Sequence, residues 1–219
     1  MSFSSTRLRG RGLCFAHGHH EVLHGVDVDV APGAVTVVCG PNGAGKSTLV
    51  ELLAGVRTPR AGRVERDGSL ALVVQRPTVP DALPVTVRDV VAMGTWSRST
   101  RTTRGRRSAH RAADDVRRTI DLVGLADLAD RPLAALSGGQ RQRALLGQGL
   151  VQDVDTLLLD EPAAGLDADS RATVRRLLAE TARERGTAVL CVSHDEQSIA
   201  AADHVVRIVD GRVRAPRPL

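Results

Sequence analysis

Short apolar runs alternate along this chain with segments in which apolar residues have helical spacing. Residues 26–30 and 35–39 are rich in β-branched side chains, which is typical of buried strands, and residues 156–159 and 188–192 repeat the pattern. Residues 170–185, between the last two runs, carry apolar positions on one helical face. Strands that alternate with helices predict an α/β fold with a mainly parallel sheet and flanking helices.

A helix is predicted directly after the glycine-rich stretch that follows residue 39. Leu49, Leu52, Leu53 and Val56 lie at i, i+3, i+4 and i+7, and Gly55 indicates where the helix ends. These apolar positions would form the buried face of the helix.

Two further β elements are predicted before residue 77. Residues 62–68, bounded by glycines, predict a short hairpin, and residues 70–74 predict a buried strand that closes on Gln75. We expect an N-terminal antiparallel β portion beside the parallel sheet.

From residue 77 the pattern becomes helical. Thr86 and Asp89 have the spacing of a capping box ahead of an apolar segment, and Ser137 and Gln140 have the same spacing. The interval therefore predicts an inserted helical subdomain. We expect one domain over residues 1–219, with a core at about 1–76 and 154–219 and the helical subdomain at about 77–153.

The net charge says little about partners. The chain has 219 residues and a formal net charge of +5, and Lys46 is its only lysine, so the other 29 basic residues are arginine. GC-rich codons produce such a bias, so the charge is weak evidence for nucleic-acid binding. Aromatic residues make up only 1%, which leaves almost nothing for base stacking. We therefore expect no nucleic-acid partner.

Composition also bounds the compartment. Hydrophobic residues, at 42%, suffice for a core and exclude global disorder. Cys14, Cys39 and Cys191 are odd in number, and the last two lie in apolar runs, so we expect free thiols in a reducing cytosol. No stretch approaches the roughly 20 apolar residues of a transmembrane helix, and we expect no signal peptide at residues 1–12, which lack an apolar region.

The glycine-rich stretch fits G-x-x-x-x-G-K-[ST] between a predicted strand and a predicted helix, which is the context of a phosphate-binding loop. Backbone N–H groups and the helix N-terminus would hold a polyphosphate, Lys46 would neutralise its β and γ oxygens, and Ser47 would bind magnesium. A chance match is the alternative, and retention of the single lysine here argues against it. The predicted loop consists of Gly40, Pro41, Asn42, Gly43, Ala44, Gly45, Lys46, Ser47 and Thr48.

Two carboxylates follow the apolar run at 156–159. Asp160 would hold the magnesium ion, and Glu161 would orient or deprotonate an attacking water. Two exposed acids at a strand end are common and are weak evidence alone, but together with the phosphate loop they indicate nucleotide hydrolysis.

A second anion site is predicted at residues 137–140. Ser137, Gly138, Gly139 and Gln140 form a capped helix start with two glycines. One polypeptide does not need this site if Lys46 already holds the phosphates. We therefore expect this anion site to be brought to a second face of a bound nucleotide.

At this point the chain resembles the ATP-binding cassette family, which implies a P-loop, RecA-like core and ATP with Mg²⁺ as ligands. The resemblance implies a head-to-tail homodimer with two ATP molecules, each between the Lys46 loop of one subunit and the Ser137 turn of the other. It also implies that Glu161 is the general base, that His194 contacts the γ-phosphate, and that Gln75 contacts the metal and couples γ-phosphate sensing to movement of the helical insert. The motifs occur in the family's order: residues 40–48 as Walker A, Gln75 as Q-loop, 136–140 as signature, 156–161 as Walker B, 165–167 as D-loop, and His194 as switch histidine.

One position departs from the family pattern. His17 occupies the place of the usual adenine-stacking aromatic, and an imidazole stacks less well on a base. His19, His20 and His24 follow, so a zinc site is an alternative to solvated loop histidines.

Residues 74–94 resemble the ATPase subunits of zinc and manganese importers. The resemblance implies a peripheral location at the cytoplasmic face of the cell membrane, with an integral-membrane permease as partner and a substrate-binding protein as an indirect one. The alternatives are an iron-siderophore importer and a soluble cluster-assembly ATPase. DNA-repair cassettes are excluded, because Ser137 follows Thr48 by only 89 positions and no coiled coil fits between them. The arginine-rich residues 97–107 are either a solvated loop or a lipid or partner contact.

Overall fold

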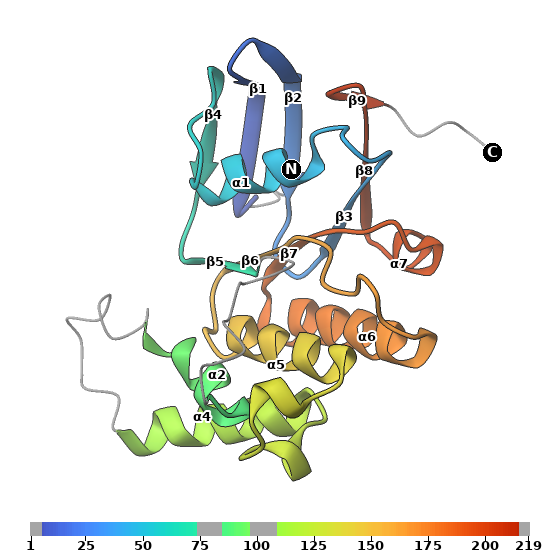
Figure 1. Ribbon diagram of the computed structural model, residues 1–219. Coiled ribbons are helices and arrows are strands. Elements are labelled where there is room, and N and C mark those ends of the chain that lie inside the picture. The colour runs from blue at the N-terminus through green and yellow to red at the C-terminus, as the bar shows by residue number, and fades with distance from the viewer. Residues whose placement is uncertain (1–5, 74–84, 97–108, 215–219) are drawn as a thin grey trace. The chain divides into compact units, whose positions relative to one another are not determined.

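The computed structural model describes residues 6–73, 85–96 and 109–214, and the chain forms two compact units (Figure 1). Gln75 and residues 97–107 lie outside the described residues. The first unit comprises Met1–Val74, Val154–Pro162 and Leu178–Leu219, and the second comprises Gln75–Asp153 and Ala163–Leu177.

A six-stranded sheet forms the centre of the first unit. Among the described residues its strands are parallel except for the last, which confirms the prediction of a mainly parallel sheet. The three central strands β6, β7 and β3 are buried at every position, which explains their uninterrupted apolar sequences. The strand order is β5 (Leu70–Val73), β6 (Thr156–Leu159), β7 (Ala188–Val192), β3 (Val35–Cys39), β8 (His204–Val209) and β9 (Arg212–Arg214).

A three-stranded antiparallel sheet completes the β structure of this unit, in the order β2 (His20–Val30), β1 (Leu8–His17) and β4 (Ala61–Arg66). The predicted hairpin at residues 62–68 is wrong, because β4 is a single strand that pairs with β1, with Leu8 opposite Arg66. A partner so distant in the sequence leaves no local signal. β1 itself has no counterpart in the sequence prediction, because its glycines and register shifts interrupt the alternation of polar and apolar residues.

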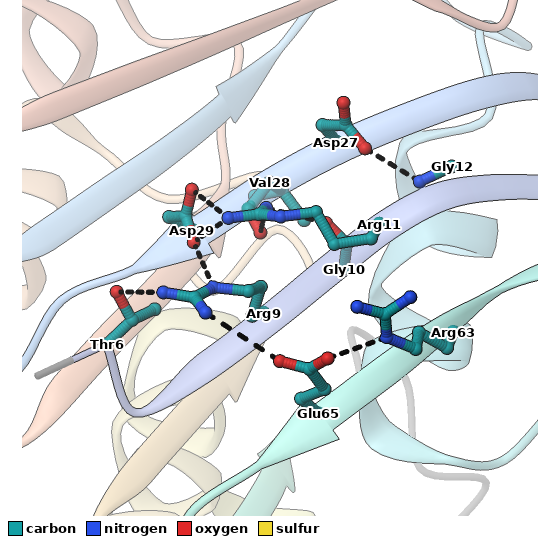
Figure 2. A network of polar contacts seen from close by, with 10 residues as sticks. All are labelled: Thr6, Arg9, Gly10, Arg11, Gly12, Asp27, Val28, Asp29, Arg63 and Glu65. Carbon is teal, nitrogen blue, oxygen red and sulfur yellow. Dashed lines mark hydrogen bonds and ion pairs between the residues drawn. The ribbon is translucent and has the colours of Figure 1, made fainter.

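One face of the antiparallel sheet carries a network of charged side chains (Figure 2). Arg9 and Arg11 bind Asp29 at N···O distances of 3.0 and 2.8 Å, and Arg9 also lies 3.7 Å from Glu65. Glu65 in turn pairs with Arg63 at 2.6 Å. Exposed ion pairs of this kind contribute at most about 1 kcal/mol each. These arginines are paired within the sheet, which agrees with the inference that the basic composition does not by itself indicate an anionic partner.

Helix α1 (Lys46–Ala54) contacts strands of both sheets, β1 and β2 on one side and β5 and β6 on the other. Gly55, in the left-handed conformation at φ 77°, ends the helix as predicted. The Arg66 side chain supports this end, because its Nε donates a hydrogen bond of 2.8 Å to the carbonyl of Leu53. The placement of Val56 on the buried helix face is wrong, since Val56 lies beyond the helix and is 64% exposed.

The second unit is helical in its described residues. Both predicted capping boxes are confirmed, Thr86 with Asp89 and Ser137 with Gln140. Helices α2, α4 and α5 pack on one another. The unit contains α2 (Val87–Met93), α4 (Ala109–Leu122), η1 (Ala126–Leu128), η2 (Leu133–Ala135), α5 (Gly138–Leu150) and the first part of α6 (Ala168–Arg185), whereas α7 (Glu196–Ala200) belongs to the first unit.

An arginine joins two of these helices. Arg143 on α5 donates hydrogen bonds of 3.0 and 3.1 Å to the carbonyls of Val123 and Gly124, at the end of α4. A cation at this position satisfies carbonyls that have no partner within the helix. None of the helices in the described residues is both long and apolar enough to cross a bilayer.

Asp155 connects the beginnings of β5 and β6 through hydrogen bonds, and these bonds lead to a prediction about stability. Its Oδ2 accepts 2.8 Å hydrogen bonds from the backbone N–H and the hydroxyl of Ser69, and Arg7 lies 3.5 Å from Oδ1. The backbone N–H bond from Ser69 lowers the pKa of Asp155 most. Asp155→Asn is expected to lower the free energy of unfolding by about 1 kcal/mol at neutral pH, because the side chain is partly exposed.

Urea unfolding of both proteins between pH 3 and 7 checks this prediction. The lowered pKa means that the carboxylate stabilises the fold above its unfolded-state pKa, near 3.8, and that this contribution disappears as the pH falls below it. The difference between the two proteins should therefore shrink below about pH 4. A difference that stays constant down to pH 3 would contradict the role given to the charge.

Candidate active site

The turn between β3 and α1 has no room for a side chain at two of its glycines, Gly40 and Gly45. Gly40 has φ 147°, and a β-carbon there would lie 1.9 Å from the backbone oxygen of Ile208. Gly45 has φ 96°, and a β-carbon there would lie 2.6 Å from the Leu23 side chain. The backbone of residues 40–45 is therefore packed against β8 and β2, which gives a fixed loop at the N-terminus of α1.

Lys46, the first residue of α1, reaches back over this loop. The side chain is buried, and its Nζ donates hydrogen bonds of 3.0 and 2.8 Å to the carbonyls of Gly40 and Pro41. Burial lowers the pKa of Lys46. An ammonium group has three donors, so a loop-bound lysine can still donate to an anionic oxygen held by the same loop.

Asp160 follows β6, beside the loop. Burial raises the pKa of the Asp160 carboxyl, and a hydrogen bond with the Ser47 side chain acts in the opposite direction. Its Oδ1 is buried and has no hydrogen-bond partner within the described residues. A carboxylate oxygen without a partner next to a hydroxyl is a donor set that Mg²⁺ accepts, so these two residues fit a magnesium site.

Glu161 has a strained backbone and a histidine partner. Its φ of 49° lies in the left-handed region, which residues other than glycine rarely adopt and which costs of order 1 kcal/mol. Its Oε1 lies 2.7 Å from Nε2 of His194, whose ring is 42% exposed. A strained backbone conformation persists only where the surrounding structure maintains it. Here the conformation orients the Glu161 carboxylate toward His194.

Sheet topology brings these groups together. Within the first unit, β6, β7 and β3 are adjacent and parallel, so the residues after them meet at one edge of the sheet. Asp160 and Glu161 follow β6, His194 follows β7, and the Lys46 loop follows β3. The predicted phosphate loop, acid pair and histidine therefore form one cluster.

The N-terminal histidines do not form a metal centre among the described residues, in which no group of three or more His, Cys, Asp or Glu side chains is arranged to hold an ion. His24 pairs with Glu21 at 3.2 Å. His17 is exposed at the end of β1, with its ring edge-on to Phe15 at a centroid distance of 5.0 Å. Its contact with adenine stays a prediction, as does the role of Gln75.

The Ser137 turn belongs to the second unit. Ser137 is the N-cap of α5, its hydroxyl accepts from the backbone N–H of Gln140 at 3.3 Å, and the Gln140 side chain accepts from the Ser137 N–H at 2.9 Å. The capping box satisfies these two N–H groups. It does not pair the backbone N–H groups of Gly138 and Gly139 at the helix N-terminus. A β-carbon on Gly138 would have no neighbour within 4 Å.

Sequence reasoning missed the role of Ser170 at the start of α6. Asp167 is followed by the helix at Ala168, and its Oδ1 and Oδ2 accept from the backbone N–H and hydroxyl of Ser170 at 2.8 and 3.0 Å. The D-loop aspartate is thus a helix cap. The signal was available, because Asp167 and Ser170 have N-cap and N3 spacing, but a predicted start at residue 170 left the cap outside the helix.

Comparison with known proteins agrees with this arrangement. The family model described as ABC transporter matches residues 23–164. The zinc import ATP-binding protein ZnuC of Paramagnetospirillum magneticum is 41% identical over 89% of this chain and 71% of its own length. The ferric enterobactin transport ATP-binding protein FepC of Escherichia coli is 34% identical over 98% and 83%. Relatives with similar identities are named for hemin and aliphatic sulfonate import.

A solved structure gives the same result for the fold. A metal-chelate type ABC transporter in an inward-facing conformation superposes with a TM-score of 0.84 at 28% identity, over 96% of this chain and 82% of that chain. The recognised cassette and its α/β fold are confirmed, whereas the names of the relatives cover several cargoes. The chain therefore belongs to the ABC transporter family and is one of its ATP-binding, ATP-hydrolysing proteins.

Proposed function

We propose that this chain is the ATPase subunit of a membrane importer whose cargo is a divalent metal, zinc or manganese. The clustering of the Lys46 loop, Asp160, Glu161 and His194 in one unit carries the ATPase mechanism. The cargo is supported by the resemblance of residues 74–94 to zinc and manganese importers and by three relatives named for zinc import, at 36 to 41% identity.

An iron-siderophore importer is the second candidate. It is favoured by the relative named for ferric enterobactin transport, which aligns with 98% of this chain. The relatives compared are named for import or transport, which supports a membrane importer over a soluble cluster-assembly ATPase.

In the proposed mechanism the phosphate loop binds the ATP polyphosphate. The backbone N–H groups of residues 42–48 surround the β-phosphate, and the Lys46 ammonium exchanges part of its bonding to the Gly40 and Pro41 carbonyls for phosphate oxygens. Ser47 and Asp160 would hold Mg²⁺, with Gln75 as a further ligand, and the bound ion would supply charge neutralisation of the phosphates. His17 lies against the adenine base.

Hydrolysis uses the strained carboxylate. Glu161 accepts a proton from the attacking water, and the 2.7 Å contact with His194 holds the carboxylate in position. His194 is exposed enough to reach the γ-phosphate as well. Both residues follow central strands of the same sheet, which limits their movement relative to the phosphate loop.

A second copy of the chain completes the site. Each ATP is held between the Lys46 loop of one subunit and the Ser137 turn of the other, where the N–H groups of Gly138 and Gly139 face the γ-phosphate. The open space at Gly138 supports this assignment, because nothing in the chain itself requires a glycine there. The helical subdomain at about residues 77–153 contacts an integral-membrane permease, which places the subunit on the cytoplasmic face, with a substrate-binding protein as an indirect partner.

Lys46→Ala is expected to weaken ATP binding strongly or to abolish turnover, because it removes the one cation that the loop supplies. A loss of at least about tenfold in ATP affinity is expected for one charged contact. Titration with a fluorescent ATP analogue measures the binding, and phosphate release measures the turnover. Arg63→Ala, which removes an exposed cation of the antiparallel sheet, is the control. Normal turnover in the Lys46 variant would exclude the loop as the catalytic site.

Glu161→Gln is expected to bind ATP, fail to hydrolyse it, and accumulate as an ATP-bound dimer. The carboxamide cannot accept the proton of the attacking water, while the phosphate loop is unchanged. Size-exclusion chromatography with light scattering, with ATP and magnesium, detects the dimer. A variant that stays monomeric at saturating ATP contradicts the two-subunit site.

Gly138→Ala in the same background separates a partner contact from a folding effect. Alanine is favoured over glycine in helices by up to about 1 kcal/mol, so the monomer should be at least as stable. The ATP-dependent dimer should nevertheless weaken, since the added methyl group lies where the partner's nucleotide approaches. Undiminished dimerisation would remove Gly138 from the interface.

Uptake measurements test the cargo. Cells lacking this chain are expected to lose zinc or manganese uptake, to regain it with the wild-type chain, and not to regain it with Lys46→Ala. Radioactive zinc, manganese and siderophore-bound iron serve as probes. Loss of siderophore uptake with normal metal uptake would favour the second candidate. Purification in a complex without an integral-membrane partner would contradict transport.

A further inference from the structure

The D-loop and the Ser137 turn, both in the second unit, meet at one hydroxyl group. Ser170, on the first turn of α6, is half-buried. A β-carbon built at Gly139 would lie 3.3 Å from Ser170 Oγ and 3.5 Å from Leu166 Cδ2. Gly139 has helical backbone geometry, so the proximity of these side chains, and not its φ, is what favours glycine at this position.

The position of the hydroxyl is fixed by its other partner. Ser170 Oγ donates to Asp167 Oδ2 at 3.0 Å, and the Ser170 backbone N–H donates to Oδ1 at 2.8 Å. These bonds lower the pKa of Asp167, the backbone N–H contributing most. Both carboxylate oxygens of the aspartate therefore bind the residue that supports Gly139.

The two neighbours of Gly139 are on one short segment. Leu166 is buried, and it precedes Asp167 directly. Any shift of residues 166–170 would therefore move the surface on which the first turn of α5 rests. The backbone N–H groups of Gly138 and Gly139 lie in this turn, and the capping box does not pair them.

We propose that Ser170 is a positioning residue for ATP hydrolysis: its hydroxyl, held by Asp167, supports Gly139 and so aims the N-terminus of α5 at the nucleotide bound by the partner subunit. This inference rests on the proposed two-subunit site. Ser170 touches neither nucleotide nor water in this role, and it acts through Gly139. It couples the D-loop to the Ser137 turn within one chain.

The test compares Ser170→Ala with Ser170→Thr in the Glu161→Gln background. The alanine variant is expected to raise the dissociation constant of the ATP-dependent dimer about tenfold, and threonine, which keeps a hydroxyl, should restore most of it. ATP affinity of the monomer should change less than about twofold, since the phosphate loop belongs to the other unit. In the chain with Glu161 intact, kcat should fall and KM should change little.

Thr173→Ala is the matched control. It removes a hydroxyl one turn further along α6, where Oγ1 donates only to the Asp169 carbonyl at 3.0 Å. If Ser170 contributes only to stability, Ser170→Ala and Thr173→Ala would both lower the melting temperature. Dimerisation below that temperature would then be unchanged. That result would overturn the proposal.

A double-mutant cycle with Gly139→Ala tests the contact itself. The added β-carbon crowds Ser170 Oγ, so Gly139→Ala should weaken the dimer. Ser170→Ala makes room for the added β-carbon, so the dimer of the double variant should be no weaker than the dimer of the weaker single variant. A double variant weakened by the product of the two effects would show that the residues act independently and would overturn the proposal.

The failures are distinguishable. If Glu161→Gln alone stays monomeric with ATP, the two-subunit site is wrong and the role of Ser170 is wrong with it. If Glu161→Gln dimerises and its Ser170→Ala derivative dimerises equally well, only the role of Ser170 is wrong.

Discussion

The parallel pairing of β6, β7 and β3 is the constraint on which the active site depends. Parallel neighbours end at the same edge of a sheet, so a loop, an acid pair and a histidine that are far apart in sequence are gathered there. The backbone of Gly40 also packs closely against the Ile208 carbonyl, which holds the loop against the adjacent strand β8. Displacing any of these strands would separate the groups that act on one phosphate.

Burial gives this edge its electrostatic character. It lowers the pKa of Lys46 and raises that of Asp160, so the fold disfavours the charged form of both groups. In the proposed mechanism, ATP would bring anionic oxygens to the Lys46 ammonium and a divalent cation would bring positive charge to the Asp160 carboxylate. The strained backbone of Glu161 is a further cost that the surrounding sheet sustains, and it aims the carboxylate at His194.

In the proposed two-subunit site, the second unit supplies a different kind of anion site. Its contacts are backbone N–H groups at a capped helix start, and their direction depends on how α5 is supported. Ser137 and Gln140 cap the helix from inside the turn, and the Ser170 hydroxyl, bound to Asp167, is proposed to support the same turn from the neighbouring helix.

The sequence by itself determined the local chemistry: the phosphate loop, the acid pair, the buried strands and both capping boxes. These depend on short-range spacing and on the types of residues present. Only the tertiary structure decided that β4 pairs with β1, that Val56 lies outside its helix, and that the Ser170 side chain lies where a β-carbon at Gly139 would be crowded. The physical reason is that a strand's partner and a glycine's neighbour are set by packing between distant segments, which leaves no periodicity in either one.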